Sequence, residues 1–164
     1  MAPKYAPHFI VLLFFLVAST GCDLLGTSGT AADQLKPHMD APDDVVQGDS
    51  MSVRYHITNA TIGSVELTSG GCLATIGIYN DENERLPVKG TDVGCALILR
   101  NHTLAPGASL TQERTIRMKL LDLDELVEPG TYRIRATPNI ISVNGEEVNF
   151  RPTEHDITVR SADA

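Results

Sequence analysis

The sequence predicts an all-β protein, an antiparallel immunoglobulin-like β-sandwich of about eight short strands over residues 40–160. Stretches in which apolar and polar residues alternate follow one another along the chain. Glycine, proline and asparagine separate these stretches at intervals typical of turns. Hardly any stretch has the apolar spacing of an amphipathic helix, so we expect two sheets packed face to face.

The first part of the predicted domain contains an acidic segment and two strands. Residues 40–49 are rich in aspartate, and a solvated loop explains them better than a calcium site, because the oxygens lack tight alternate spacing around a glycine turn. The dipeptide Val45-Val46 is expected to form a short edge strand. From Val53 to Thr58 apolar residues occupy every second position, which predicts a half-buried strand with His56 on its outward face. A second strand begins at Val65.

The middle of the chain is expected to form a meander. The pair Gly70-Gly71 ends the strand that starts at Val65, and Cys72–Tyr79 reads as the next strand. A polar hairpin turn follows, and the chain then returns over Arg85–Val88. Cys95 opens another apolar run, Ala96–Leu99, which we expect to be a strand.

The last part carries the clearest turn signals. Pro106-Gly107 is typical of a type II turn, and the alternation of Ile116, Met118 and Leu120 predicts the strand after it. The expected elements beyond that strand are a single helical turn in Leu121–Glu128, a turn at Pro129-Gly130 leading to Tyr132 as in the tyrosine corner of immunoglobulin-like domains, a type I′ hairpin at Asn144-Gly145, and a final strand at Ile157–Val159.

The N-terminal segment resembles a bacterial lipoprotein signal peptide. Lys4 precedes the apolar run Phe9–Ala18, and the small residues that follow lead into Cys22. This run is too short for a membrane-spanning helix, which needs about 20 apolar residues. The resemblance implies a signal peptide over residues 1–21, lipid on Cys22, and a flexible tether over residues 22–39. The lipid would bind the chain to a membrane of the bacterial cell envelope; inner and outer membrane both stay open.

Two further cysteines, Cys72 and Cys95, are available for a disulfide. An exported chain meets an oxidising compartment, and each cysteine follows a glycine at the start of a predicted strand. Both would then lie at one end of the sheet, which favours a pair over two buried thiols.

Composition and motifs exclude several functions. The net charge of −8 disfavours nucleic acid as a partner, because the domain would repel phosphate. The histidines have no spacing typical of a zinc site, and we find no phosphate loop, dinucleotide fingerprint or nucleophile elbow. We therefore predict no catalytic residues, no metal, no cofactor and no enzymatic activity.

Several motifs together resemble the BsuPI-like domain, the intracellular proteinase inhibitor type. They are Tyr55–Asn59, Val65–Gly70, Leu104–Gly107 with Leu110, and Glu128–Tyr132, and the resemblance covers roughly residues 45 to 160. It implies a sandwich fold and, for the family's named member, inhibition of a serine protease. The chain departs from that family in its export and in its cysteine pair.

We therefore expect an envelope-tethered lipoprotein whose domain binds an envelope or extracellular protein without catalysis. The alternative is a proteinase inhibitor of the BsuPI type in the periplasm or at the cell surface. The candidate partner-binding loop follows the strand that starts at Cys72 and lies within the predicted disulfide-closed segment. Its residues are Asn80, Asp81, Glu82, Asn83 and Glu84.

Overall fold

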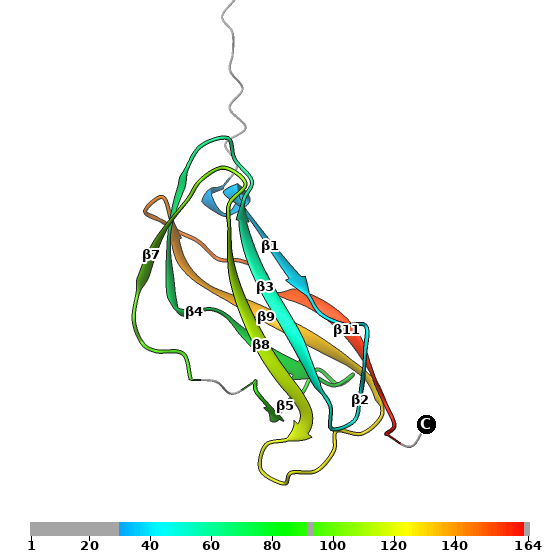
Figure 1. Ribbon diagram of the computed structural model, residues 1–164. Coiled ribbons are helices and arrows are strands. Elements are labelled where there is room, and N and C mark those ends of the chain that lie inside the picture. Colours follow the sequence, from blue (N-terminus) through cyan, green and yellow to red (C-terminus); the bar gives the residue numbers. More distant parts are fainter. Residues whose placement is uncertain (1–29, 92–93, 163–164) are drawn as a thin grey trace, which may run out of the picture.

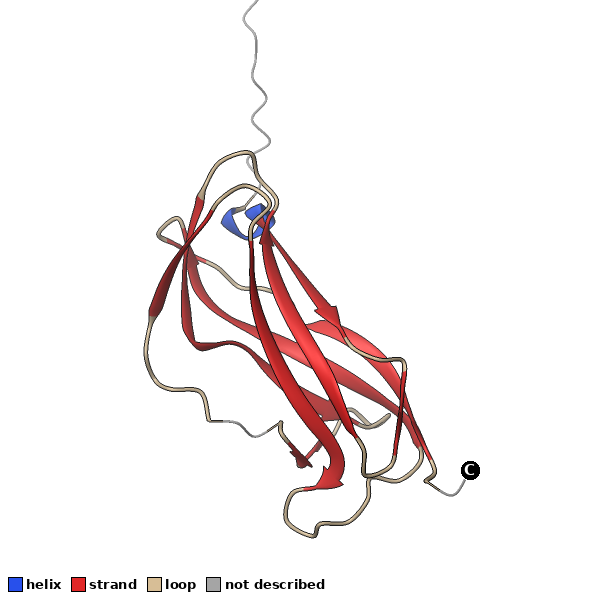
Figure 2. Ribbon diagram, viewed as in Figure 1, coloured by secondary structure: helices blue, strands red, loops and turns tan. Residues whose placement is uncertain are grey.

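Two β-sheets face one another in the computed structural model, which describes residues 30–91 and 94–162 (Figures 1 and 2). One sheet has four strands in the order β1-β3-β8-β6. In the seven-stranded sheet, β2-β11-β9-β4-β5 form the main path, β10 pairs with β9, and β7 pairs with β4. Among these strands the pairing is antiparallel except between β11 and β2. The predicted immunoglobulin-like β-sandwich is confirmed.

The described strands range from two residues to fifteen, and a short 3-10 helix precedes them. They are η1 (Ala31–Gln34), β1 (Leu35–Asp40), β2 (Asp44–Val46), β3 (Ser50–Asn59), β4 (Val65–Tyr79), β5 (Arg85–Leu86), β6 (Val88–Lys89), β7 (Arg100–Leu104), β8 (Ser109–Leu120), β9 (Gly130–Val143), β10 (Glu146–Glu147) and β11 (Thr153–Arg160).

The core forms where alternating apolar residues of the two sheets meet. In β3, Val53, Tyr55 and Ile57 are completely buried and the residues between them are not, as the alternation predicts. β8 contributes Ile116 and Met118 to the same core. Burial of this apolar surface is the main force that holds the sheets together.

β4 is one long strand, where the sequence predicted two strands separated by Gly70-Gly71. Its pairing with β9 shifts register between Thr68 and Ala74, so the glycines interrupt the ladder without ending the strand. At this point the side chain of Gln112, from β8, takes the place of a neighbouring strand. Its Oε1 accepts from the N–H of Leu73 at 2.7 Å and of Ala74 at 3.2 Å, and its Nε2 donates to the Ala74 carbonyl at 2.8 Å.

The predicted tether boundary at residue 39 is wrong, because η1 and β1 belong to the domain. Leu35 and Met39 are buried, and β1 pairs with β3 along its whole length. Pro37 concealed this strand in the sequence, although proline is tolerated on an edge strand such as β1. The predicted signal peptide and Cys22 lie outside the described residues.

The predicted helical turn in Leu121–Glu128 is also absent. These residues form a loop in which Leu126 bridges back to Lys119, and Asp124 has a positive φ of 53°. Lys89 and Lys119 both pair with the Asp124 carboxylate and lower its pKa. These two ion pairs favour the turned-back path over a helical one.

The domain has two distinct ends (Figure 1). The helix η1, which Thr30 caps, lies beside the turns at residues 60–64, 105–108 and 144–145, and the Asn144 side chain donates to that of Gln34 at 2.7 Å. The loops at residues 80–84 and 121–129 lie at the opposite end. The end at Thr30 is called the entry end below, and the other is called the far end.

Candidate functional site

Cys72 and Cys95 form the predicted disulfide, with an S–S distance of 2.05 Å and a Cα–Cα distance of 5.3 Å. The pairing was predicted correctly, but the geometric reason for it was wrong. Cys72 lies in the middle of β4, and Cys95 lies in the connection between β6 and β7. The bond ties that connection to the side of the long strand.

The apolar run after Cys95 is not a strand, which corrects the prediction. The backbone of Ala96 packs directly on Gly71, where an added Cβ would lie only 2.3 Å from the Ala96 carbonyl oxygen. The disulfide and this contact hold the run out of register with β4, so it cannot join the sheet. Leu97 and Leu99 consequently remain largely exposed.

The candidate loop Asn80–Glu84 is a compact, exposed turn at the far end. The N–H of Asn80 donates to the Glu84 carbonyl at 3.0 Å, and the N–H of Glu84 donates to Oδ1 of Asn80 at 2.7 Å. Asn83 has a positive φ of 63°, which asparagine tolerates better than most residues. Arg135 stacks over Tyr79 and donates to Oδ1 of Asn83 at 2.6 Å, which fixes the turn to the sheet.

A groove of about 490 Å³ lies beside this turn and is lined by residues of both far-end loops. Asn80 and Asp81 form one wall, and Leu126 contributes to the other. Tyr132 also lines the groove, and its hydroxyl donates to the Glu128 carbonyl at 2.9 Å, which confirms the predicted tyrosine corner. Burial and the nearby charges of Glu128 and Asp81 raise the pKa of Tyr132.

Three leucines of the loop after β8 project at the far end, and the sequence analysis missed them. Leu121, Leu123 and Leu126 are 43%, 66% and 43% exposed. The signal was their alternation with Asp122, Asp124 and Glu125, which we interpreted as one apolar side of a helical turn. Exposed leucines beside a groove are more typical of a contact surface than of a solvated loop.

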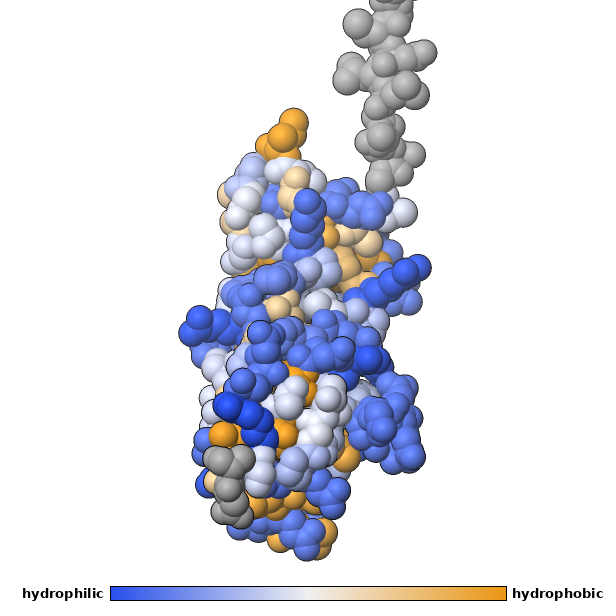
Figure 3. All heavy atoms as spheres, turned by 90° about the vertical axis from the view of Figure 1, so that its right-hand side faces the viewer, coloured by the Kyte–Doolittle hydropathy of each residue, from blue (hydrophilic) through white to orange (hydrophobic). Residues whose placement is uncertain are grey.

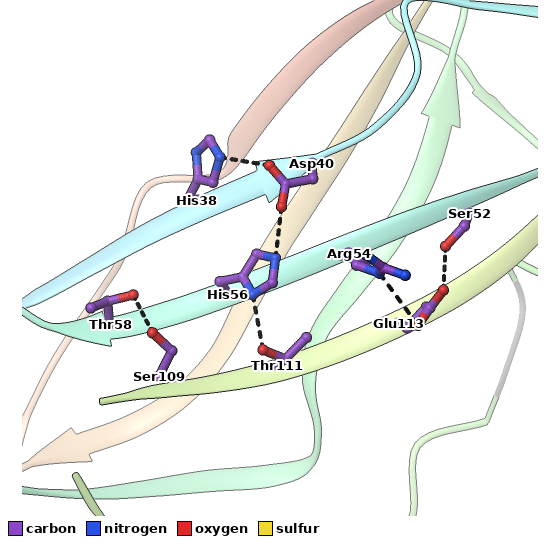
Figure 4. A network of polar contacts seen from close by, with 9 residues as sticks. All are labelled: His38, Asp40, Ser52, Arg54, His56, Thr58, Ser109, Thr111 and Glu113. Carbon is purple, nitrogen blue, oxygen red and sulfur yellow. Dashed lines mark hydrogen bonds and ion pairs between the residues drawn. The ribbon is translucent and has the colours of Figure 1, made fainter. Parts of the chain in front are cut away.

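The outward face of the four-stranded sheet carries a polar network (Figure 4). The Asp40 carboxylate bonds Nε2 of His38 and Nε2 of His56, each at 2.8 Å, and these bonds lower the pKa of Asp40. Nδ1 of His56 bonds the Thr111 hydroxyl at 2.9 Å, and Glu113 bonds Ser52. His56 lies on the outward face, as predicted, and the network joins β1, β3 and β8 side to side.

The described residues contain neither a metal-binding cluster nor a membrane-spanning helix. Over residues 30–91 and 94–162, no cluster of three or more histidine, cysteine or carboxylate side chains is arranged to hold a metal ion. Within the same ranges no helix is long and apolar enough to cross a membrane.

The comparisons with known proteins give matches in structure and none in sequence. No family model matches it, and no curated protein matches its sequence. The native α-2-macroglobulin of Escherichia coli, from domain MG7 to the C-terminus, is 20% identical at a TM-score of 0.50, covering 78% of this chain and 17% of that one. A second structure of the same macroglobulin is 19% identical at a TM-score of 0.51, covering 79% of this chain and 7% of that one.

The CARDB domain of the PF1109 protein from Pyrococcus furiosus matches at a lower TM-score of 0.39, with 15% identity, and covers 77% of this chain and 87% of that one. The macroglobulin matches span only a small part of those long chains and, at this identity, show the fold alone. The macroglobulin matches and the sheet order together establish an immunoglobulin-like β-sandwich.

Proposed function

We propose that the chain is an envelope-tethered lipoprotein that presents a non-catalytic immunoglobulin-like domain for protein binding. The sequence around Cys22 supports the tether, since an apolar run and small residues precede this cysteine. The described domain begins at Thr30, so only a short segment separates the domain from the lipid site.

The observation that carries the binding role is the position of the groove at the far end. Its walls come from the Asn80–Glu84 turn and from the loop that carries the exposed Leu121, Leu123 and Leu126. The tether would join at Thr30, directly before η1, which lies at the entry end (Figure 1). A domain held in this way would turn its groove and its apolar side chains away from the anchoring membrane, where a partner can reach them.

The proteinase-inhibitor alternative gains no support from the turn itself. An inhibitor loop must enter an active site in an extended form, whereas Asn80–Glu84 is closed on itself by hydrogen bonds. The far end suits a partner that lies across the groove and contacts the leucines. We therefore keep the binding module as the proposed function.

The binding role is tested by photo-cross-linking from defined positions of the full chain in bacterial cells that export it. A photoreactive residue replaces Asp81 or Leu123 at the far end. Ile62 at the entry end is the control, because its side chain is fully exposed whereas that of Leu123 is 66% exposed. We expect discrete adducts from positions 81 and 123 and none from 62. Replacing Asn80–Glu84 with glycine and serine should abolish the adduct from 123. Adducts that form equally from all three positions would contradict the proposal.

A further inference from the structure

A second surface lies on the side of the sandwich, at the open edge between the sheets. β8 pairs with β3 along residues 109–117 and with β6 only at Arg117 and Leu120. In the seven-stranded sheet, on the same side of the sandwich, β7 pairs with residues 65–69 of β4, and β5 pairs with Ile78 and Tyr79 of β4. A cleft of about 270 Å³ lies between the unpaired parts of β4 and β8. The opposite side of the sandwich is mainly hydrophilic, with small separate apolar patches (Figure 3).

The cleft is basic, although the chain as a whole is acidic. Arg100, His102 and Arg114 line it, and none of its described lining residues is a carboxylate. Arg114 donates to Sγ of Cys72 at 3.1 Å, and a sulfur atom is a weak acceptor. Neither Arg100 nor Arg114 has an ion-pair partner among residues 30–91 and 94–162, whereas other arginines, such as Arg135, do.

These guanidinium groups therefore have donors free for an anion. Each guanidinium carries five N–H donors in a planar fork that matches a carboxylate. The cleft is half enclosed by Gln112 and by the backbone at Gly70-Gly71, which weakens the competition from water. A carboxylate that entered between Arg100 and Arg114 would find a favourable field and two sets of donors.

The edge of β8 at the cleft also offers backbone groups. Both the N–H and the C=O of Met118 bond the segment before β3, so they point toward β3. Since backbone direction alternates along a strand, the N–H and C=O of Thr111 and Glu113 point the other way, toward the open edge. No strand of the described chain pairs with them. An extended peptide can therefore add to β8 by main-chain hydrogen bonds.

Apolar side chains lie directly beside the cleft. Leu97 and Leu99 project from the segment that the disulfide holds against β4, and Ile141 of β9 is partly exposed nearby. These three residues line a second hollow of about 550 Å³, which shares the pair Gly70-Gly71 with the cleft. The surface as a whole therefore combines a basic cleft, an open strand edge and an apolar rim.

We propose that this surface binds an extended segment of a partner protein that combines acidic and apolar residues, with a carboxylate between Arg100 and Arg114. The match of charge favours an acidic segment. Nucleic acid would place phosphate in the same cleft, but the net charge of −8 repels a phosphate polymer over the rest of the domain. This surface is separate from the far-end groove, so either can fail without the other.

The experiment uses the exported full chain without lipid, in which Cys22 is replaced by serine, and measures fluorescence anisotropy with two labelled peptides. One peptide alternates valine and glutamate, and its control has glutamine at each glutamate. We expect the glutamate peptide to bind at least tenfold more tightly than the glutamine peptide, and less tightly as salt rises. Replacing Arg100 and Arg114 with glutamine should weaken binding at least tenfold. Arg151→Gln removes one positive charge outside the cleft and should change the affinity less than twofold.

A second variant tests the strand edge. Thr111→Pro removes an N–H that points away from β3, so the variant should fold while losing at least fivefold in peptide affinity. Equal binding of the two peptides, or unchanged binding by the arginine double variant, would overturn the proposal. The proposal would also be overturned if millimolar inorganic phosphate competed completely with the glutamate peptide while Thr111→Pro bound that peptide normally. The cleft would then be a site for a small anion. Tighter binding of a single-stranded DNA oligomer than of the glutamate peptide would also overturn it.

Discussion

The side chain of Gln112 replaces a missing strand at the middle of β4, and its removal should destabilise the domain. Gln112→Met keeps a side chain of similar length but removes its donors and its acceptor. The N–H groups of Leu73 and Ala74 and the carbonyl of Ala74 would each lose a partner. Leu73 and Ala74 are 8% and 1% exposed, so water cannot easily replace the amide.

The expected cost follows from the number of groups left without a partner. A buried polar group without a hydrogen bond costs about 1 to 3 kcal/mol. Two donors share one oxygen here, and Gln112 is only half-buried, so the low end of the range applies to each group. We expect the free energy of unfolding to fall by about 3 kcal/mol.

Urea denaturation followed by circular dichroism measures this change, and hydrogen exchange locates it. Thr115→Ala, at an exposed position of the same strand, is the control and should cost less than about 1 kcal/mol. In Gln112→Met the amides of Leu73 and Ala74 should exchange much faster under native conditions. A loss below about 1 kcal/mol, with unchanged exchange at both amides, would refute the role assigned to Gln112.

Three further predictions concern the disulfide, the core and the sheet face. Replacing Cys72 and Cys95 with alanine should lower the free energy of unfolding by about 3.5 kcal/mol for a separation of 23 residues, measured in urea; a loss below about 1 would contradict this. The buried Tyr55 hydroxyl has no hydrogen-bond partner among the described residues, and burial raises its pKa, so Tyr55→Phe should leave the melting temperature unchanged or raise it. Hydrogen bonds to two histidines lower the pKa of Asp40 in the folded state. The stabilisation of the fold by these bonds is therefore fully present above the unfolded pKa of Asp40, about 4, and is lost as the pH falls through the lower folded pKa. The difference in stability between the wild type and Asp40→Asn should accordingly vanish in acid; a constant difference would contradict the assignment.

The sequence predicted the elements whose signals are local. Alternation in Val53–Thr58 depends only on which face of a strand is buried, and the structure confirms it. The type I′ hairpin at Asn144-Gly145 is confirmed by positive φ angles of 50° and 82°, and Pro106-Gly107 by a φ of 72° at Gly107. The tyrosine corner at Tyr132 is likewise confirmed by its hydrogen bond to Glu128.

The errors arise where distant contacts override the local pattern. Ala96–Leu99 has the composition of a strand, but the disulfide and the contact at Gly71 hold it out of register. Leu35–Asp40 reads as a linker because of Pro37, yet its pairing with β3 makes it a strand. The role of Gln112 could not be predicted, since it depends on how the edge of β8 meets the middle of β4.

The candidate sites were predicted only in part, for the same reason. The far-end turn Asn80–Glu84 was found from its polar composition, but the groove beside it forms only because the tyrosine corner and the loop after β8 converge there. The basic cleft unites Arg100, from β7, with Arg114, from β8, and the sequence gives no local sign that they meet.

Lipid labelling decides whether Cys22 tethers the domain to a membrane. The full chain is expressed in a bacterium supplied with radioactive palmitate, and the label on the protein is measured after membrane extraction. We expect a labelled protein in the membrane fraction, and loss of both label and membrane association in Cys22→Ser. A mature wild-type protein that is exported without label and stays in the aqueous fraction would contradict it.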